Sequence, residues 1–148
     1  MSQDGTRVDL DTSLGYLLKQ AHSVLRSAMD GALRPLGMTV PQYACLELLA
    51  QRPGLSNSDL ARGAFVSRQS MNVLLQSLER DRLVARPEQP STGRVLPVQL
   101  TPLGRERLQA ASAAVSSVET QMRRGLNTSQ QRQLRDLLAS CVRSLSES

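Results

Sequence analysis

Residues 67–80 read SRQSMNVLLQSLER, and in this stretch the apolar and polar side chains separate with the period of a helix. The apolar side chains recur at steps of three and four residues and form one face, namely Met71, Leu74, Leu75 and Leu78. The opposite face is polar and consists of Arg68, Gln69, Asn72, Gln76 and Arg80. Ser67 precedes both faces and is a favourable N-cap residue. The stretch therefore predicts a helix from Ser67 to about Arg80 with one buried face and one exposed polar face.

The neighbouring residues predict two more short helices and a β-hairpin. Thr39 followed by Pro41 is a helix start, so we expect one helix at about 41–52. Ser56 and Asp59 have the spacing of a capping box, which predicts another helix at about 57–63. Residues 83–86 and 94–100 read as two strands around a turn-rich segment, and Pro97 requires an edge position or a bulge. This order of elements predicts a winged helix-turn-helix module over residues 39–100.

Longer amphipathic helices flank this module on both sides. Their apolar stripes predict helices at about 12–35, 102–124 and 128–146, the last beginning at a capping box over 128–131. We expect one domain over 1–148, mainly α with a small β wing: a winged helix-turn-helix with N- and C-terminal dimerisation helices at 12–36 and 102–146. The module has a small core of its own, so the flanking stripes need another surface. A homodimer is one solution, and an intramolecular helix bundle is the other.

Composition excludes several classes of protein. The 18 basic and 13 acidic residues give a net charge of +5, and all but one of the basic residues are arginine. The soft or imidazole ligands are His22, Cys45 and Cys141, and their spacing fits no metal site, so we expect neither a metal nor a cofactor. No nucleophile motif is present, which argues against an enzyme. The polar start and the short apolar runs predict a cytoplasmic protein without membrane contact.

The polar face of the 67–80 helix has the chemistry of a surface that binds bases in duplex DNA. Gln and Asn form paired hydrogen bonds with adenine, Arg does so with guanine, and a helix N-terminus binds phosphate. We therefore expect DNA contacts from the helix itself and from two hairpin arginines, namely Ser67, Arg68, Gln69, Ser70, Asn72, Gln76, Arg86 and Arg94. A helix face and hairpin arginines that are merely solvated remain the alternative. Three aromatic residues are too few for a surface that stacks single-stranded bases, so double-stranded DNA is the expected partner.

Four stretches at residues 60–72, 78–86, 93–94 and 98–104 follow one another in an order that resembles a known family. This is the multiple antibiotic resistance regulator (MarR) family of bacterial transcriptional regulators, and the resemblance covers about residues 12–146. It implies a two-fold dimer that places its recognition helices in successive major grooves of a pseudo-palindromic operator, with Arg94 in the minor groove. The family's wing usually has an Asp two residues before this arginine. Thr92 stands there instead, so no ion pair is implied at that position.

The resemblance also implies a pocket for a small effector between the dimerisation helices and the DNA-binding module. Tyr16, His22, Arg26 and Tyr43 are the candidate lining residues, and they suit an aromatic or anionic ligand. A packed or solvated histidine is the alternative for His22. We thus expect a dimeric repressor that a small molecule releases from DNA. A thiol sensor that uses Cys45 or Cys141, and a protein-interaction scaffold without DNA binding, are the alternatives.

Overall fold

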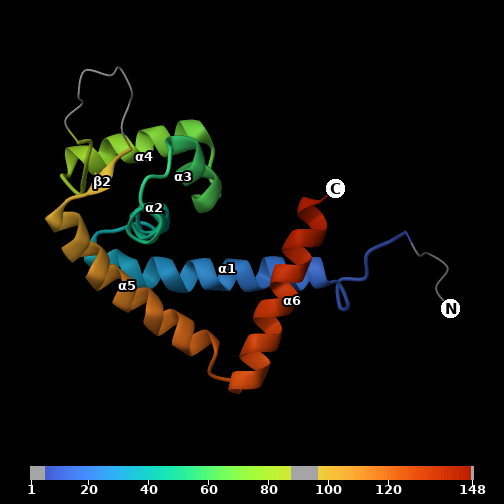
Figure 1. Ribbon diagram of the computed structural model, residues 1–148. Helices are drawn as coiled ribbons and strands as arrows, with labels where there is room; N and C mark the ends of the chain where they lie inside the picture. Colours follow the sequence, from blue (N-terminus) through green and yellow to red (C-terminus); the bar gives the residue numbers. More distant parts are fainter. Residues whose placement is uncertain (1–5, 88–96, 148) are drawn as a thin grey trace.

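The computed structural model describes residues 6–87 and 97–147 and is mostly helical (Figure 1). Its elements in chain order are α1 (Leu14–Leu33), the 3₁₀ helix η1 (Arg34–Leu36), α2 (Val40–Gln51), α3 (Asn57–Ala64), α4 (Arg68–Arg80), β1 (Val84–Ala85), β2 (Gln99–Leu100), α5 (Pro102–Met122) and α6 (Thr128–Ser146). The two strands are antiparallel, with Val84 opposite Leu100. The expected mainly α fold with a small β hairpin is confirmed. No helix in the described ranges is long and apolar enough to cross a bilayer.

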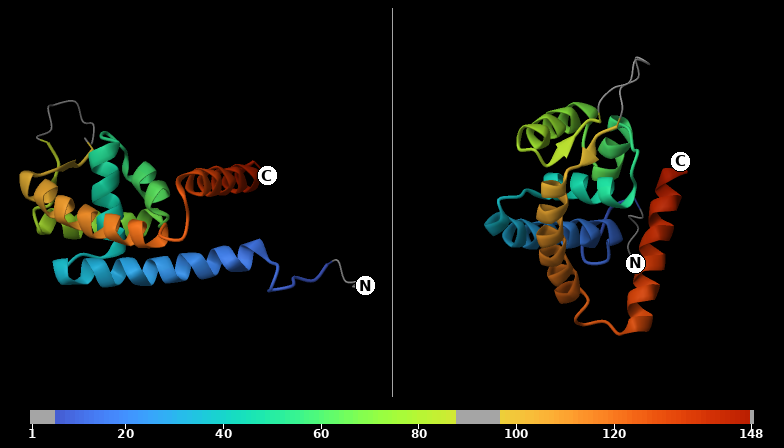
Figure 2. Two further views of the ribbon diagram at one scale, coloured as in Figure 1. Left: turned by 90° about the horizontal axis from the view of Figure 1, so that it is seen from below. Right: turned by 60° about the vertical axis from the view of Figure 1, so that its left-hand side comes forward.

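The helices fall into a compact module and a set of longer helices around it (Figure 2). The module consists of α2, α3, α4 and the hairpin, and it packs on α5 and on the C-terminal end of α1. α5 also packs along α1. α6 stands apart from the module, and none of its described residues is buried. The core therefore lies inside the module and extends to α1 and α5 through Leu33, Leu108, Ala111 and Val115.

The first helix is shorter than expected at both ends. Ser13 is its N-cap, because the Ser13 Oγ accepts the backbone N–H of Tyr16 at 3.0 Å, so α1 begins at Leu14 rather than near residue 12. At the other end, α1 stops at Leu33 and continues as the 3₁₀ turn η1. Pro35 explains the change, because it has no N–H and its ring clashes with the carbonyl of an α-helix. Gly37 then ends the turn with a φ of +67°.

Two other expected boundaries are wrong by one or two residues. α5 ends at Met122 rather than at residue 124. The capping box of α6 is formed by Asn127 and Gln130, not by residues 128 and 131: the Asn127 Oδ1 accepts the Gln130 N–H at 2.8 Å, and the Gln130 Oε1 accepts the Asn127 N–H at 3.0 Å. Asn exceeds Thr as an N-cap, which accounts for the shift.

Both ends of α4 are flanked by a residue with left-handed backbone. Among the described residues other than glycine, Phe65 (φ 61°) and Arg82 (φ 62°) are the ones with positive φ. This conformation costs a residue with a side chain about 1–2 kcal/mol, whereas glycine adopts it freely. We expect Phe65→Gly and Arg82→Gly each to raise the free energy of unfolding by up to about 1 kcal/mol, measured by urea denaturation at one protein concentration.

Gly37→Ala and Gly54→Ala are the matched controls for these two variants. Both glycines have positive φ with open space around the position of a Cβ, so alanine introduces backbone strain and no clash. The two control variants should therefore be less stable than the unmodified protein. A loss of stability in Phe65→Gly and Arg82→Gly as well would contradict the assignment of strain to these positions.

Candidate nucleic-acid interface

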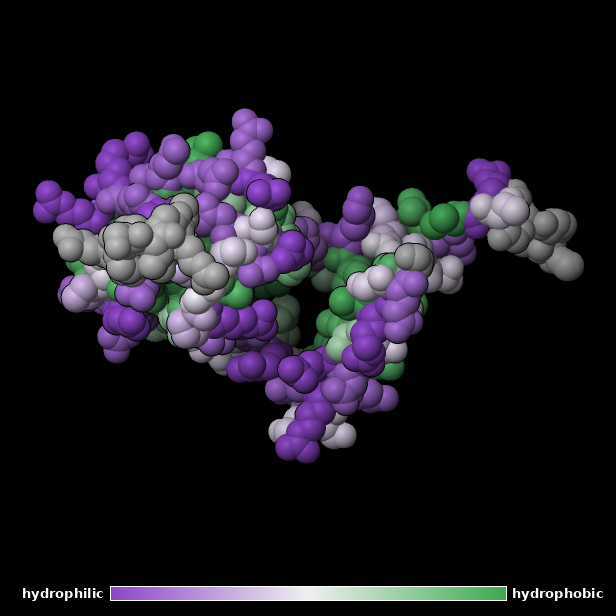
Figure 3. All heavy atoms as spheres, turned by 45° about the horizontal axis from the view of Figure 1, so that its top comes forward, coloured by the Kyte–Doolittle hydropathy of each residue, from purple (hydrophilic) through white to green (hydrophobic). Residues whose placement is uncertain are grey.

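α4 has the two faces that its sequence predicts. Met71, Leu75 and Leu78 are buried in the core, and Leu74 is half buried. All the polar residues expected on the opposite face are exposed, namely Arg68, Gln69, Asn72, Gln76 and Arg80. Hydrophilic side chains cover most of the visible surface of the lobe that contains α4 (Figure 3). The helix thus presents a row of hydrogen-bonding side chains to solvent, with the exposed Val73 among them.

The N-terminus of α4 is fixed by two serines. The Ser67 Oγ accepts the backbone N–H of Ser70 at 3.0 Å, and the two hydroxyl oxygens also lie 3.0 Å apart. Both side chains are exposed beside Arg68 and Gln69. The positive end of the helix dipole and two hydroxyl groups therefore meet at one exposed point, and the exposed Arg68 follows in the first turn. Such a combination favours a phosphate group.

The Asn72 side chain is oriented by a residue that the sequence analysis missed. The Nδ2 of Asn57, at the start of α3, donates a hydrogen bond to the Oδ1 of Asn72 at 2.9 Å. This bond links α3 to the exposed face of α4 and sets the direction of the Asn72 amide. The two residues are fifteen positions apart, and no local pattern in the sequence signals their contact.

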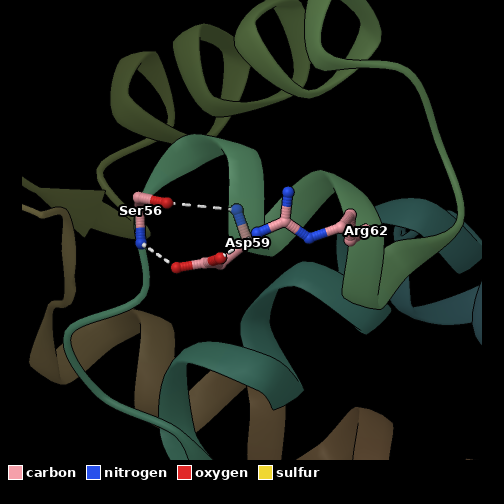
Figure 4. A network of polar contacts seen from close by, with 3 residues as sticks. All are labelled: Ser56, Asp59 and Arg62. Carbon is pink, nitrogen blue, oxygen red and sulfur yellow. Dashed lines mark hydrogen bonds and ion pairs between the residues drawn. The ribbon is translucent and has the colours of Figure 1, made fainter.

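α3 is itself fixed by the capping box that its sequence predicts (Figure 4). The Ser56 Oγ accepts the Asp59 N–H at 3.1 Å, and the Asp59 carboxylate accepts the Ser56 N–H at 3.4 Å. The same carboxylate forms an ion pair with Arg62. Hydrogen bonds from Ser56, together with the charge of Arg62, lower the pKa of the Asp59 carboxyl. The box places Asn57 at the first position of the helix, from which it reaches α4.

The hairpin supplies one described arginine at the edge of this surface. The Nε of Arg86 lies 3.4 Å from the Oε1 of Glu79, and both side chains are partly exposed. The ion pair ties the end of β1 to the last turn of α4. The other expected hairpin contact, Arg94, falls in residues 88–96 and lies outside the described part of the chain, as does Thr92.

A close backbone contact joins the module to the start of α5. The Thr101 N–H donates to the Leu83 carbonyl at 3.1 Å, and the Thr101 Oγ1 donates to the Arg82 carbonyl at 2.6 Å. Gly104 packs so closely that a Cβ there would lie 2.0 Å from the Leu83 oxygen. Because this neighbour is backbone, no side-chain movement could relieve the clash. The backbones of α5 and the hairpin therefore approach so closely at residue 104 that only glycine fits there.

The four expected effector residues do not gather around one described pocket. His22 and Arg26 are exposed one turn apart on α1, where Arg26 pairs with Asp30 at 3.7 Å. Tyr16 lies ten residues before Arg26, or about 15 Å along the helix axis. Tyr43, on α2, is half buried and donates its hydroxyl to Glu47 at 2.5 Å. Burial, reinforced by the Glu47 carboxylate, raises the Tyr43 pKa well above its ordinary value.

An open groove of about 430 Å³ lies between α2, β2 and α5 as far as Ser116. None of the four expected effector residues lines it, but Glu47, the partner of Tyr43, does. Its wall combines five polar or charged residues with two alanines and two leucines, namely Glu47, Ala50, Leu100, Arg105, Leu108, Gln109, Ser112, Ala113 and Ser116. Tyr43 does not line the groove, but its side chain contacts Glu47 and Ser112, which do.

The two cysteines occupy opposite environments. Cys45 is fully buried in the module, and burial raises its pKa to about 12, so its thiol is protonated at neutral pH. Cys141 is exposed on α6. The thiolate is the reactive form of cysteine, and Cys45 is therefore poorly suited to sensing oxidants.

Apolar side chains that the chain does not cover lie along α1 and α6. They are more than a third exposed, namely Leu14, Leu17, Leu18, Val24, Leu134, Leu137, Leu138, Val142 and Leu145. Figure 3 shows hydrophobic surface in the region of these two helices. A stripe of this size on two helices is typical of a surface that another polypeptide covers. The intramolecular bundle considered from the sequence is not formed by the described residues.

This arrangement of short helices, hairpin and exposed polar helix defines a winged helix-turn-helix protein. A family model described as MarR family matches residues 36–95. The transcriptional repressor Rv2887 of Mycobacterium tuberculosis is 44% identical over 128 residues, which cover 86% of this chain and 92% of the repressor. The chain therefore belongs to the MarR family, as its sequence motifs indicate.

Crystal structures of the same mycobacterial protein match the fold. The complex with salicylic acid has a TM-score of 0.74 at 42% identity and covers 88% of this chain and 96% of its own. The complex with DNA has a TM-score of 0.71 at 38% identity and covers 88% and 98%. The likeness extends over nearly the whole of both chains, so the flanking helices belong to it as well as the module.

Proposed function

We propose that the protein is a dimeric transcriptional repressor that binds a specific double-stranded operator through α4 and is released by a small aromatic or anionic effector. The main supporting observation is the exposed row of Gln69, Asn72 and Gln76 on a helix whose opposite face is buried. Amide side chains in such a row can form paired hydrogen bonds with adenine in the major groove. The DNA-bound structure of Rv2887 supports the same type of partner.

The contacts divide into those that select bases and those that add affinity. Gln69, Asn72 and Gln76 bond base edges. Ser67, Arg68 and Ser70 bind phosphate at the N-terminus of α4, where the two serine hydroxyls meet and all three side chains are exposed. Arg86 contacts the backbone beside the hairpin, and Arg94, outside the described residues, enters the minor groove.

The dimer forms through the uncovered apolar faces of α1 and α6. Two copies related by a two-fold axis present two α4 helices to one side of the duplex. Recognition helices in successive major grooves lie about 34–36 Å apart, so the operator is a pseudo-palindrome with half-sites at that spacing. The chromosome is the target, which places the protein in the cytoplasm, and its role requires no enzymatic activity.

The effector is proposed to be a small aromatic anion bound between the dimerisation helices and the module. The structure of Rv2887 with salicylic acid supports this chemistry. Arg26 and His22 lie one turn apart on α1 and offer a cation and an imidazole to a carboxylate. Tyr16 and Tyr43 complete the proposed lining. Tyr16 lies too far along α1 to share a small ligand with Arg26 of the same protomer, so it would line the site of the other protomer. Cys45 is fully buried and its thiol is protonated at neutral pH, which makes a thiol switch at this residue the weaker mechanism.

The experiment begins by sequencing the DNA that the protein retains from fragmented host genome. The enriched motif then serves as the operator in fluorescence anisotropy, and single-base variants of it are used as competitors. We expect Asn72→Ala and Gln76→Ala each to cost about 1–3 kcal/mol on the base they contact and little on substitutions elsewhere. Salicylate added to the unmodified complex should lower the DNA affinity.

Gln121→Ala, which truncates an exposed glutamine on α5, is the matched control and should bind like the unmodified protein. An Arg86→Ala variant should weaken binding to all sequences alike and reduce the salt slope by about 0.9. Retained DNA without a common motif would contradict the proposed function. Unchanged base preference in both Asn72→Ala and Gln76→Ala would show that α4 is not the recognition helix.

A further inference from the structure

The exposed polar face of α4 carries one apolar side chain, Val73, that does not belong to the hydrophobic core. Val73 is 61% exposed, in contrast to Met71, Leu75 and Leu78 of the same helix. It is also absent from the partly buried side chains that pack around the core. Four residues separate it from Gln69 and three from Gln76, so it lies between these two side chains on the helix surface.

The stability of α4 gives no reason for a valine at this position. A β-branched side chain loses rotamer freedom in a helix, and Val forms helices less readily than Ala, Leu, Arg or Gln. An exposed apolar group also gains nothing from solvent. The position therefore suits a function in which the side chain leaves water when a partner binds.

The neighbouring side chains indicate which partner group this is. Gln69, Asn72 and Gln76 match the N6 and N7 edge of adenine, and adenine pairs with thymine. The C5 methyl of thymine is the apolar group that this base pair presents in the major groove, next to the adenine edge. A side chain with two methyl groups among amides is thus complementary to an A·T step.

We propose that Val73 is a specificity-determining residue that contacts the C5 methyl of a thymine in each half-site of the operator. The inference rests on the proposed function, because it requires α4 to lie in the major groove. It adds a preference that hydrogen bonds alone do not supply, since a methyl group neither donates nor accepts. Replacement of that thymine by uracil removes the contacted group and leaves the base pairing unchanged.

The test is a scan of the selected operator in which each thymine is replaced by deoxyuridine, one symmetric pair at a time. For the unmodified dimer we expect one pair of positions to weaken binding about fourfold per half-site, the factor for one methyl group removed from an apolar contact. Val73→Ala should bind the thymine operator more weakly and should no longer distinguish thymine from uracil at that pair. Val8→Ala truncates an exposed valine outside the helices and serves as the control, with the full uracil effect retained.

Each result bears on one claim. A scan without any uracil effect, or an effect that persists in full in Val73→Ala, would overturn the role of Val73 while binding to the unmodified operator left the proposed function intact. If Val73→Ala binds DNA as tightly as the unmodified protein, Val73 does not contact the operator, and the proposal is likewise overturned. Loss of all operator binding by the unmodified protein would refute the proposed function, and this inference with it. Thermal unfolding of Val73→Ala should occur at the same temperature as that of the unmodified chain or slightly above it, because the side chain is not part of the core and alanine is the better helix former.

Discussion

Replacing Gly104 with alanine should lower the free energy of unfolding by about 3 kcal/mol or more and abolish operator binding. The added Cβ would lie 2.0 Å from the Leu83 oxygen, so α5 and the hairpin must move apart. That movement would stretch the two hydrogen bonds that Thr101 makes to the carbonyls of Arg82 and Leu83. Urea denaturation at one protein concentration measures the stability, and fluorescence anisotropy with the selected operator measures the binding.

Gly31→Ala is the matched control for this variant. Gly31 is also helical, but no atom lies within 4 Å of the position of its Cβ. Alanine there should stabilise α1 by about 0.5–1 kcal/mol. A Gly104→Ala protein as stable as the unmodified one would show that the two backbones are farther apart than described.

The second large effect is expected for Leu137→Glu combined with Leu138→Glu. These side chains are 57% and 40% exposed within one chain, and we propose that a second chain covers them. Burying two carboxylates in that interface is prohibitive, so the dimer should dissociate. Loss of the second recognition helix should then weaken operator binding by about 10²–10⁴-fold. Sedimentation velocity at micromolar concentration measures the state of association.

A double variant with the same added charge separates this effect from simple repulsion of DNA. Gln133→Glu with Ser140→Glu places both carboxylates away from the apolar stripe of α6, and this protein should remain a dimer that binds DNA. A well-folded monomer for the unmodified chain at micromolar concentration would contradict the proposal. An unchanged dimer for the leucine variant would place the interface elsewhere.

Local signals in the sequence predict most of the fold. The apolar spacing within α4 and the serine caps at Ser56 and Ser67 act over a few residues, and each element that they predict is present. The errors lie at boundaries where two local preferences compete. At the start of α6, Asn127 and Thr128 each stand three residues before a glutamine and could each form a capping box. Asn is the stronger N-cap residue, so the helix begins after Asn127.

The site is predicted less completely, because its geometry depends on contacts between distant residues. The polar face of α4 follows from periodicity alone, whereas the Asn57–Asn72 hydrogen bond joins two helices and has no signature in either. The same holds for Gly104, whose close approach to Leu83 depends on the path of the hairpin. Tyr16 and Arg26 are ten residues apart on α1, and a rise of about 1.5 Å per residue separates them by about 15 Å along the axis. These two effector candidates therefore do not meet within one protomer.

The close contact at Gly104 fixes the start of α5 to the hairpin, so any tilt of α5 is amplified along its length. Its first turn is bound to the hairpin, and 21 residues of helix extend from there towards α6, a length of about 31 Å. A tilt of about 5° over that length displaces the far end by about 3 Å, a large error for helices that must match grooves about 34–36 Å apart. In the proposed dimer, a small rotation of α5 at its far end would therefore displace the module and α4 together, and the proposed effector would release DNA without touching α4.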